Sequence, residues 1–305
     1  MSENTRAGFA AIIGAPNAGK STLVNALVGA KVSIVTPKVQ TTRFQVRGVM
    51  MHAQSQVVLV DTPGVFAPRR RLDRAMVASA WEGATDADAI VHVVDAAAAK
   101  AGGGRTAEDV DRVIDGLRTQ ARKATLVLNK IDLLKREELL AIAQKLHETG
   151  VYDDVFMISA SNGDRVKDLA DHLAGLMPEG PWLYPEDQIA DLSQRVLAAE
   201  VTREKLFLRV HEELPYALTV ETDTWKELKD GGVRIEQTVF VEREGHRPII
   251  LGKNGQTAKW VGKAAREELE AQLGRKVHLF LFVKVRPKWG EDRERYTAMG
   301  LDFDV

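Results

Sequence analysis

The chain has no cysteine among its 305 residues, which excludes disulfides and thiolate metal sites. Its seven histidines never stand at the close spacing of paired metal ligands, so we expect no metal site built from histidine. No apolar run approaches the roughly 18 residues of a membrane-spanning helix. The run from Phe9 to Ile13 is too short for a signal peptide and leads straight into a glycine loop.

The chain also has almost no net charge, with a formal value of -1, and an ordinary apolar fraction of 45%. These values are typical of a soluble globular protein and not of a disordered one. The length is large for a single core and suits two domains.

Short apolar runs alternate with amphipathic segments over the first half of the chain. This order predicts an α/β fold with a mainly parallel sheet and helices on both faces, whose ligands bind at the carboxyl ends of the strands. The Ala- and Gly-rich stretch 96–105 is expected to be a surface loop. The runs expected to be strands are 9–14, 56–64, 89–96, 124–132 and 155–160.

Three prolines in residues 177–187 indicate a linker, after which the pattern changes. A helix is expected at about 193–213, strands near 217–223 and 232–243, a helix at about 256–273 and a strand from 277. The predicted α/β domain spans 1–180, the linker 181–195, a smaller α+β domain 196–290 and a tail 291–305.

The stretch GAPNAGKS matches G-x-x-x-x-G-K-[ST] and lies between a predicted strand and a predicted helix. The glycines allow backbone N–H groups to face an anion, Lys20 can reach the β- and γ-phosphates, and the Ser21 hydroxyl can bind Mg²⁺. A glycine-rich turn is the alternative. The predicted phosphate-binding residues are Gly14, Ala15, Pro16, Asn17, Ala18, Gly19, Lys20, Ser21, Thr22 and Gly64.

The stretch DTPG ends the next predicted strand. Asp61 can hold Mg²⁺ and the Gly64 N–H can bond the γ-phosphate, so Asp61, Thr62, Pro63, Gly64 and Val65 are predicted to form a second switch segment. Small regulatory GTPases carry a water-orienting glutamine at the position of Val65. Valine cannot bond water, so we expect slow intrinsic hydrolysis and another means of placing the water.

The segment PKVQTTRFQ, between these motifs, is predicted to be a first switch ordered by GTP. Thr42 is the favoured second hydroxyl for Mg²⁺, and Thr41 is the alternative. In related GTPases an asparagine placed like Asn17 recruits K⁺, and we hypothesise the same here. Equal hydrolysis rates in Na⁺ and K⁺ would exclude it.

NKID and SAS end two further predicted strands. The Asp132 carboxylate offers two acceptors to the N1–H and the exocyclic amine of guanine, a pair of neighbouring donors that adenine lacks. Asn129 can buttress the loop, the Lys130 stem can lie over the base, and the Ala160 N–H, flanked by Ser159 and Ser161, can meet the guanine oxygen. Four motifs in this order predict a guanine-nucleotide site with Mg²⁺ and GTP or GDP.

The second domain carries a G-x-x-G loop, Gly252, Lys253, Asn254 and Gly255, before a predicted helix. Lys259, Lys263 and Arg266 follow on one helix face, while Val261, Ala265 and Leu269 should pack on the sheet. From Arg243 to Trp289 there are eleven Lys and Arg against four acidic residues, a net charge of +7. This basic lobe favours nucleic-acid binding over a merely solvated face.

The strand from Val277 ends in a cluster of positive charge. Lys284, Arg286 and Lys288 are predicted to bind RNA phosphates, and Trp289 either stacks on a base or caps the core. A solvated strand end is the alternative.

Together the motifs GAPNAGKST, QTTR, DTPG, NKID and SAS, with ELPYALTVE, VEREGHRPIILGKNG and VHLFLFVKVRPKW, resemble the bacterial Era family of GTPases. The resemblance covers about residues 6 to 300. It implies a type II KH fold in the second domain and binding near the 3′ end of the small-subunit (16S) ribosomal RNA. It also implies a role in small-subunit assembly, in the cytoplasm with a peripheral inner-membrane contact, and no DNA partner.

A different class of function is also compatible with the basic lobe. The chain could be a signalling GTPase whose C-terminal domain binds a protein or an acidic membrane. A kinase is disfavoured, because Asp132 and the switch threonines suit a switch better.

Overall fold

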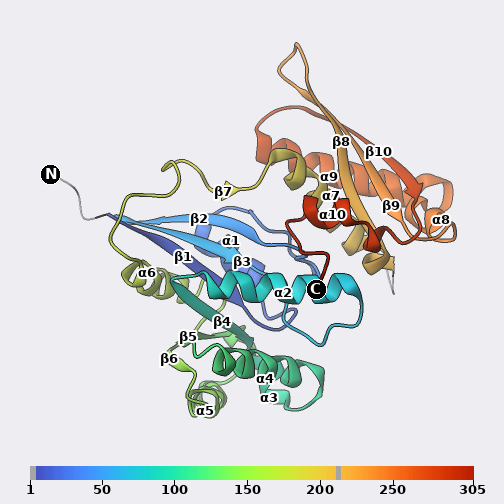
Figure 1. Ribbon diagram of the computed structural model, residues 1–305. Coiled ribbons are helices and arrows are strands. Elements are labelled where there is room, and N and C mark those ends of the chain that lie inside the picture. Colours follow the sequence, from blue (N-terminus) through green and yellow to red (C-terminus); the bar gives the residue numbers. More distant parts are fainter. Residues whose placement is uncertain (1–4, 211–213) are drawn as a thin grey trace. The chain divides into compact units, whose positions relative to one another are not determined.

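The computed structural model describes residues 5–210 and 214–305, and their contacts divide them into two units (Figure 1). The first unit comprises Met1–Asp191 together with Tyr296–Val305, and the second comprises Leu192–Arg295.

The first unit is built on a seven-stranded sheet with the order β6-β5-β4-β1-β3-β2-β7. Strands β6, β5, β4, β1 and β3 are parallel, whereas β2 is antiparallel to both β3 and β7. The bounds are β1 Arg6–Ile13, β2 Val46–His52, β3 Ser55–Asp61, β4 Ala89–Asp95, β5 Ala124–Asn129, β6 Tyr152–Met157 and β7 Ala190–Asp191. The predicted mainly parallel sheet is confirmed.

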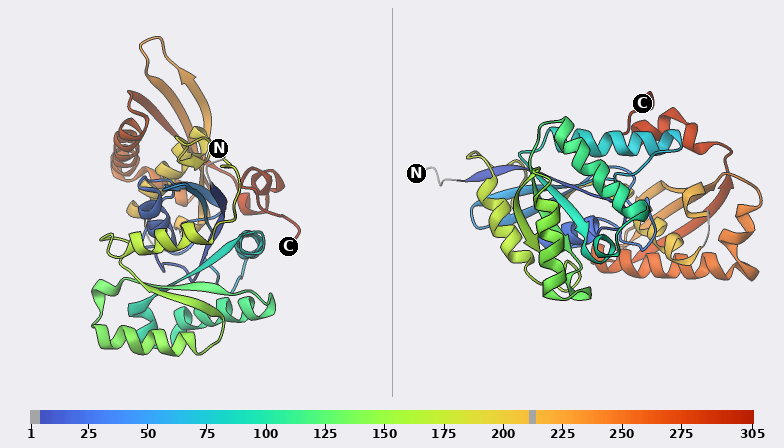
Figure 2. Two further views of the ribbon diagram at one scale, coloured as in Figure 1. Left: turned by 90° about the vertical axis from the view of Figure 1, so that its left-hand side faces the viewer. Right: turned by 90° about the horizontal axis from the view of Figure 1, so that it is seen from below.

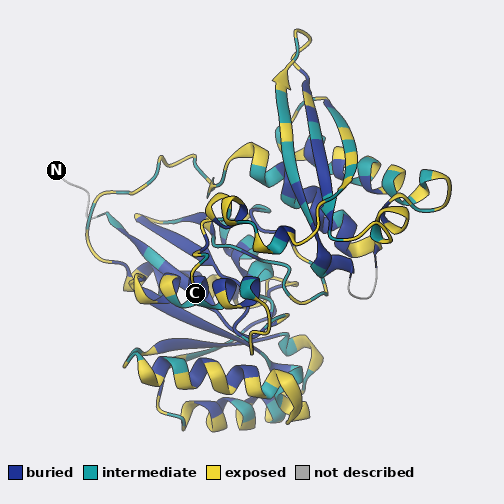
Figure 3. Cartoon of the chain, turned by 45° about the vertical axis from the view of Figure 1, so that its right-hand side comes forward, coloured by how far each residue is buried: buried dark blue, intermediate teal, exposed yellow. Residues whose placement is uncertain are grey.

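Helices cover both faces of this sheet (Figure 2). Helices α1 and α6 pack on one face, and α2, α4 and α5 pack on the other. Strand β3 is buried along its whole length, whereas the outer faces of α4 and α5 are exposed (Figure 3). The bounds are α1 Lys20–Val28, α2 Arg71–Thr85, α3 Ala96–Ala101, α4 Gly104–Thr119, η1 Ile131–Leu133, α5 Arg136–His147 and α6 Val166–Leu176.

The prediction that 96–105 is a loop was wrong. Residues Ala96–Ala101 form helix α3, and α4 begins at Gly104. The Asp95 side chain caps α3 by accepting a hydrogen bond from the Ala98 N–H at 3.0 Å. Alanine has the highest helix propensity of any residue, so one cap suffices to start a helix that low complexity concealed.

The second unit contains a three-stranded sheet of order β10-β9-β8, with β9 antiparallel to β8 and parallel to β10. Helices α7, α8 and α9 pack on one face of it, around buried residues such as Val261, Ala265 and Leu269. These three residues were predicted to face the sheet, and they do. The bounds are α7 Gln194–Arg209, η2 Leu214–Ala217, β8 Leu218–Glu227, β9 Val233–Val241, α8 His246–Leu251, η3 Lys253–Gly255, α9 Gln256–Leu273, β10 Val277–Val285, η4 Trp289–Glu291 and α10 Arg293–Ala298.

The predicted helix at about 193–213 is observed as α7, which ends at Arg209, and residues 211–213 of that prediction lie outside the described residues. Among the helices that the structure describes, none is long and apolar enough to cross a membrane.

Candidate functional site

The glycine loop that follows β1 turns into α1 at Lys20, as its motif predicted. Gly19 has φ of 97°, a left-handed conformation that favours glycine. A Cβ on Gly19 would lie 2.1 Å from the Asn129 Nδ2, so a side chain has no room there. Asn17 also has a positive φ, of 62°. The loop therefore presents its backbone without side chains in the way.

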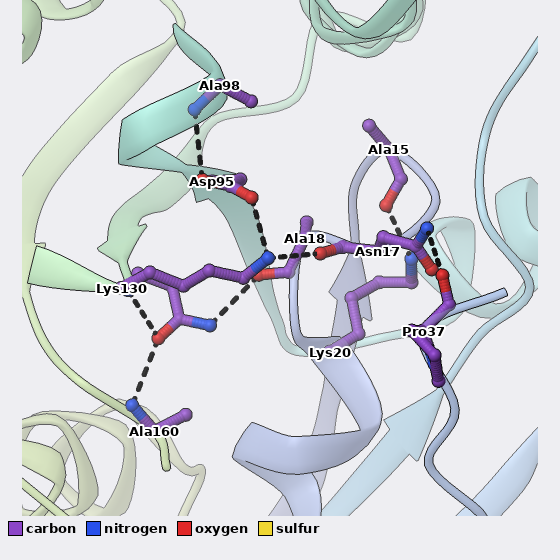
Figure 4. Close-up of polar contacts among 10 residues, drawn as sticks. Ala15, Asn17, Ala18, Lys20, Pro37, Asp95, Ala98, Lys130 and Ala160 are labelled. Atoms are coloured by element: carbon purple, nitrogen blue, oxygen red, sulfur yellow. Dashed lines mark hydrogen bonds and ion pairs between the residues drawn. The ribbon is translucent and has the colours of Figure 1, made fainter. Parts of the chain in front are cut away.

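Lys20 lies at the centre of this loop, only 6% exposed. Its Nζ donates hydrogen bonds to the carbonyl oxygens of Gly14 and Ala15, at 3.1 and 3.0 Å. The bond to Ala15 is drawn in Figure 4. Burial lowers the pKa of Lys20 to about 8, against the opposing charge of Asp61. A buried ammonium held only by neutral oxygens is poised to bind an anion.

Three side-chain oxygens converge beside Lys20. The Ser21 Oγ donates to the Asp61 Oδ2 at 2.7 Å, and the Thr42 Oγ1 lies 3.3 Å from the same atom. The two hydroxyl oxygens are 3.0 Å apart. The second oxygen of Asp61, Oδ1, is buried and has no hydrogen-bond partner among the described residues. Two hydroxyls and a carboxylate with an unused oxygen fit Mg²⁺, which prefers oxygen ligands.

The geometry at the first switch distinguishes the two threonines. Thr41 bonds back into its own segment, with its Oγ1 2.6 Å from the Thr36 Oγ1 and 2.7 Å from the Lys38 carbonyl. Thr42 alone of the pair reaches Asp61. The Asn17 Nδ2 donates to the Pro37 carbonyl at 3.0 Å, which joins the glycine loop to this segment.

In the second switch segment, Val65 is buried at 2% exposure, and its N–H donates to the Gly14 carbonyl at 3.0 Å. Its isopropyl group belongs to the core on the α2 side of the sheet. Burial raises the pKa of Asp61, while the Ser21 hydrogen bond and the Lys20 charge oppose this rise.

At the ends of β5 and β6, Asn129 is buried and organises the loops. Its Nδ2 donates to the Ala18 carbonyl at 2.9 Å, and its Oδ1 accepts from the N–H groups of Lys130 and Ala160 at 2.8 and 3.0 Å. The predicted buttress role of Asn129 therefore has a geometric basis. The Ala160 N–H, predicted for the guanine oxygen, is engaged by Asn129 and could serve a base only as a shared donor.

Lys130 makes contacts that the sequence did not reveal. Its Nζ donates to the Asn17 carbonyl at 2.9 Å and to the Asp95 Oδ2 at 2.6 Å (Figure 4). Asp132 lies on η1 with its side chain exposed. The hydroxyls of Ser159 and Ser161 are 3.2 Å apart. The two Lys130 contacts join residues far apart in sequence, so no local pattern could have predicted them.

A pocket of about 430 Å³ lies between the glycine loop and the first switch. Its lining combines phosphate-loop residues with switch residues, including Lys20, Ser21, Thr42, Gly64 and Lys130. The glycine loop, the first switch, the DTPG turn and the NKID loop, which are separate in sequence, thus meet at one pocket.

In the second unit, the G-x-x-G loop forms η3 between α8 and α9. Gly252 has φ of 73°, and a Cβ there would lie 2.3 Å from the Thr257 Oγ1. Lys253 and Asn254 are exposed at the loop tip, and Asn254 has a left-handed φ of 54°. A backbone without side chains at its two ends can approach another backbone closely.

The ten residues predicted to bind RNA separate into groups. Lys259, Lys263 and Arg266 are exposed on α9, the helix that the loop begins. Lys284 instead lies on the sheet face opposite the helices, because its neighbours Val283 and Val285 face the core.

Beyond β10, two of the predicted cations are paired. Arg286 forms an ion pair with Asp292 at 2.5 Å, and Lys288 lies 3.9 Å from Glu291.

Two of the three tryptophans of this unit, Trp260 and Trp289, differ sharply in exposure. Trp289 is 1% exposed and donates from its Nε1 to the Ala217 carbonyl at 3.1 Å, so it caps the core and cannot stack on a base. Trp260 is 41% exposed on α9, with the Arg209 guanidinium 5.4 Å from its ring. The stacking hypothesis for Trp289 is therefore wrong; Trp260 follows Lys259 directly, which was the missed signal.

The fold and the site define a P-loop GTPase joined to an RNA-binding type of domain. Residues 9–130 match the family model described as "50S ribosome-binding GTPase", and residues 213–290 match the model of the KH domain. The helix and strand order α7, β8, β9, α8, α9, β10 is the one expected of a type II KH fold.

Relatives cover the whole chain. It is 64% identical to a GTPase Era of Caulobacter vibrioides and 62% identical to one of Maricaulis maris, over 99% and 98% of the chain and 98% of each relative. An Era of Aquifex aeolicus bound to GDP.AlF4- superimposes with a TM-score of 0.90 at 36% identity, over 99% of this chain and 100% of that one. The TM-score, the identity and the coverage are the same for an Era in complex with MgGDPNP and nucleotides 1506–1542 of 16S ribosomal RNA. The chain belongs to the Era family of GTPases and hydrolyses GTP to GDP and phosphate.

Proposed function

We propose that this GTPase is a molecular switch that binds the 3′ end region of 16S ribosomal RNA and acts in assembly of the small ribosomal subunit. The single observation that carries the proposal is the exposed G-x-x-G loop continued by the basic face of α9, on a chain that also holds a complete set of guanine-nucleotide motifs. An Era of the same fold binds that region of the RNA.

In the proposed nucleotide site, the backbone N–H groups of residues 14–22 other than Pro16 surround the phosphates, and Lys20 exchanges its two carbonyl partners for phosphate oxygens. Ser21, Thr42 and Asp61 would hold Mg²⁺, which supplies positive charge against the phosphate oxygens when bound. Thr42 reaches the metal only while its segment is folded over the site. Loss of the γ-phosphate removes the contacts that keep the segment folded over the site, which makes the segment a switch.

The attacking water needs a partner other than Val65, whose side chain is buried. We propose that Asn17 and the first switch hold K⁺ there, with the Asn17 Oδ1 and the Pro37 carbonyl oxygen as ligands. The hydrogen bond from the Asn17 Nδ2 to that carbonyl, 3.0 Å in the structure, brings the two residues together and gives way to the cation. The test compares phosphate release in Na⁺ and in K⁺ at equal ionic strength. Equal rates of phosphate release would exclude a role of K⁺ and leave the proposed nucleotide site unaffected.

In the proposed RNA site, Gly252 and Gly255 let the RNA backbone approach while Lys253 contacts phosphate and the α9 cations support it. Lys284 contributes less, since it faces away from α9. Arg286 is held by Asp292 at 2.5 Å and contributes less as well, whereas Lys288 and Lys263 have longer contacts with Glu291 and Glu267, at 3.9 and 3.7 Å.

The test is fluorescence anisotropy with a short single-stranded RNA that ends in the anti-Shine–Dalgarno sequence, titrated across a salt series. We expect preference over a scrambled RNA, and loss of binding in Lys253→Asp/Asn254→Asp. Lys229→Asp is the control, because Lys229 is exposed in the turn between β8 and β9, away from the loop. No sequence preference, or equal effects of the two variants, would favour a signalling GTPase that binds a protein or a membrane. Cytoplasmic location and a peripheral inner-membrane contact stay predictions.

A further inference from the structure

The first turn of α2 contacts the first switch through one carboxylate. Asp73 is 6% exposed, and its Oδ2 accepts from the N–H groups of Arg69 and Arg70, both at 3.0 Å. Its Oδ1 accepts from the Gln40 Nε2 at 3.0 Å. Gln40 lies two residues before Thr42, the threonine that reaches Asp61. The start of α2 and the position of Thr42 are therefore connected through Asp73 and Gln40.

The same turn holds the C-terminal segment, residues 296–305, which belongs to the same unit (Figure 1). Arg71 donates from its Nη1 to the Phe303 carbonyl at 3.0 Å, and its guanidinium centre lies 4.3 Å from the centre of the Phe303 ring. Arg74 donates from its Nε to the main-chain oxygen of Val305 at 3.2 Å. A cation over an aromatic face, with two hydrogen bonds to main-chain oxygens, makes a specific docking contact.

The docked segment is also held together by contacts among its own residues. The Leu301 N–H donates to the Tyr296 carbonyl at 2.8 Å, and Leu301 is 6% exposed. The rings of Tyr296 and Phe303 meet edge to face, with centres 5.0 Å apart. The segment can therefore dock as a formed unit, which lowers the entropy lost on docking.

We propose that the α2 surface made by Arg71 and Arg74 is a docking site for the chain's own C-terminal segment, and that docking is coupled to the nucleotide through Asp73 and Gln40. In the structure Thr42 lies at Asp61 while the segment is docked. The docked segment thus accompanies the arrangement that suits a bound triphosphate. Coupling is reciprocal, so release of the segment weakens triphosphate binding relative to GDP.

Coupling between the C-terminal segment and the nucleotide is separate from RNA binding and can be tested without RNA. The absence of cysteine allows two labels to be placed without removing any native thiol. Spin labels at Thr85→Cys, exposed at the far end of α2, and Val305→Cys report the distance between helix and segment. We expect a narrow distribution with a non-hydrolysable GTP analogue and a broad one with GDP. The same distribution in both states would overturn the proposal.

A second measurement compares affinities by calorimetry. Arg71→Ala and Phe303→Ala should each lower the ratio of GTP-analogue to GDP affinity by at least about fivefold. Gln40→Glu should act in the same direction, because two carboxylates would then face each other at Asp73. Arg69→Ala is the matched control, since the Arg69 side chain is exposed and only its main-chain N–H contacts Asp73. An unchanged ratio in both Arg71→Ala and Phe303→Ala would contradict the coupling.

Discussion

Lys20 shows how a single residue can be prepared for its ligand. Its burial lowers its pKa to about 8, because the charged form loses hydration and gains only two carbonyl oxygens. Below pH 8 the amine is already charged, so phosphate binding requires no proton. Above pH 8 the free amine is neutral, and phosphate oxygens that raise its pKa must bring a proton with them.

Because burial lowers the pKa of Lys20 to about 8, we expect GDP binding to take up more protons at pH 8.5 than at pH 7. Calorimetry in two buffers of different ionisation enthalpy measures the uptake directly. Uptake near zero at pH 8.5 would show that Lys20 does not titrate in this range.

Asp132 is the residue on which guanine specificity is predicted to depend. Asp132→Asn replaces one acceptor with an amide donor, which faces the donors of guanine and should weaken GTP binding by at least about a hundredfold. Xanthine carries a carbonyl where guanine carries the amine, so the variant should bind xanthosine triphosphate better than GTP. Competition between the two nucleotides is the measurement, and unaltered GTP preference would contradict the assignment.

At the scale of elements, the sequence predicted what local pattern controls and missed what distant contacts control. The strand ends of the α/β unit and the helix Gln256–Leu273 follow from periodicity and glycine positions. Helix α3 was missed because the low Ala and Gly complexity of residues 96–105 indicated a loop, although Asp95, the last residue of β4, also caps a helix. The link between Lys130 and Asp95 was invisible, since it joins loops after β5 and β4 that only the sheet order brings together.

The tryptophans near β10 and on α9 provide a paired prediction. Trp289→Phe keeps one aromatic ring but removes the rest of the buried indole and its hydrogen bond to Ala217, so it should cost more than about 1 kcal/mol of unfolding free energy and leave RNA affinity unchanged. Trp260→Ala should leave stability nearly unchanged and weaken RNA binding, since the ring is exposed beside the cations of α9. Chemical denaturation and RNA titration of both variants test this contrast. Loss of RNA binding in Trp289→Phe but not in Trp260→Ala would contradict the assignment of Trp289 to the core and of Trp260 to the RNA surface.

At the scale of the whole molecule, a net charge of -1 hides two functional parts. The first unit collects its nucleotide motifs at one edge of a sheet, and the second presents a basic loop and helix. The overall composition did not indicate a basic second unit, but the distribution of charge along the chain did. We infer that the nucleotide state of the first unit controls RNA binding by the second, as the proposed switch requires.

The most direct test is the RNA titration repeated with GDP and with a non-hydrolysable GTP analogue, at one salt concentration. We predict that the RNA ending in the anti-Shine–Dalgarno sequence binds at least about fivefold more tightly in one nucleotide state than in the other. The same difference should be absent in Lys253→Asp/Asn254→Asp. Identical affinities in both nucleotide states would contradict the account.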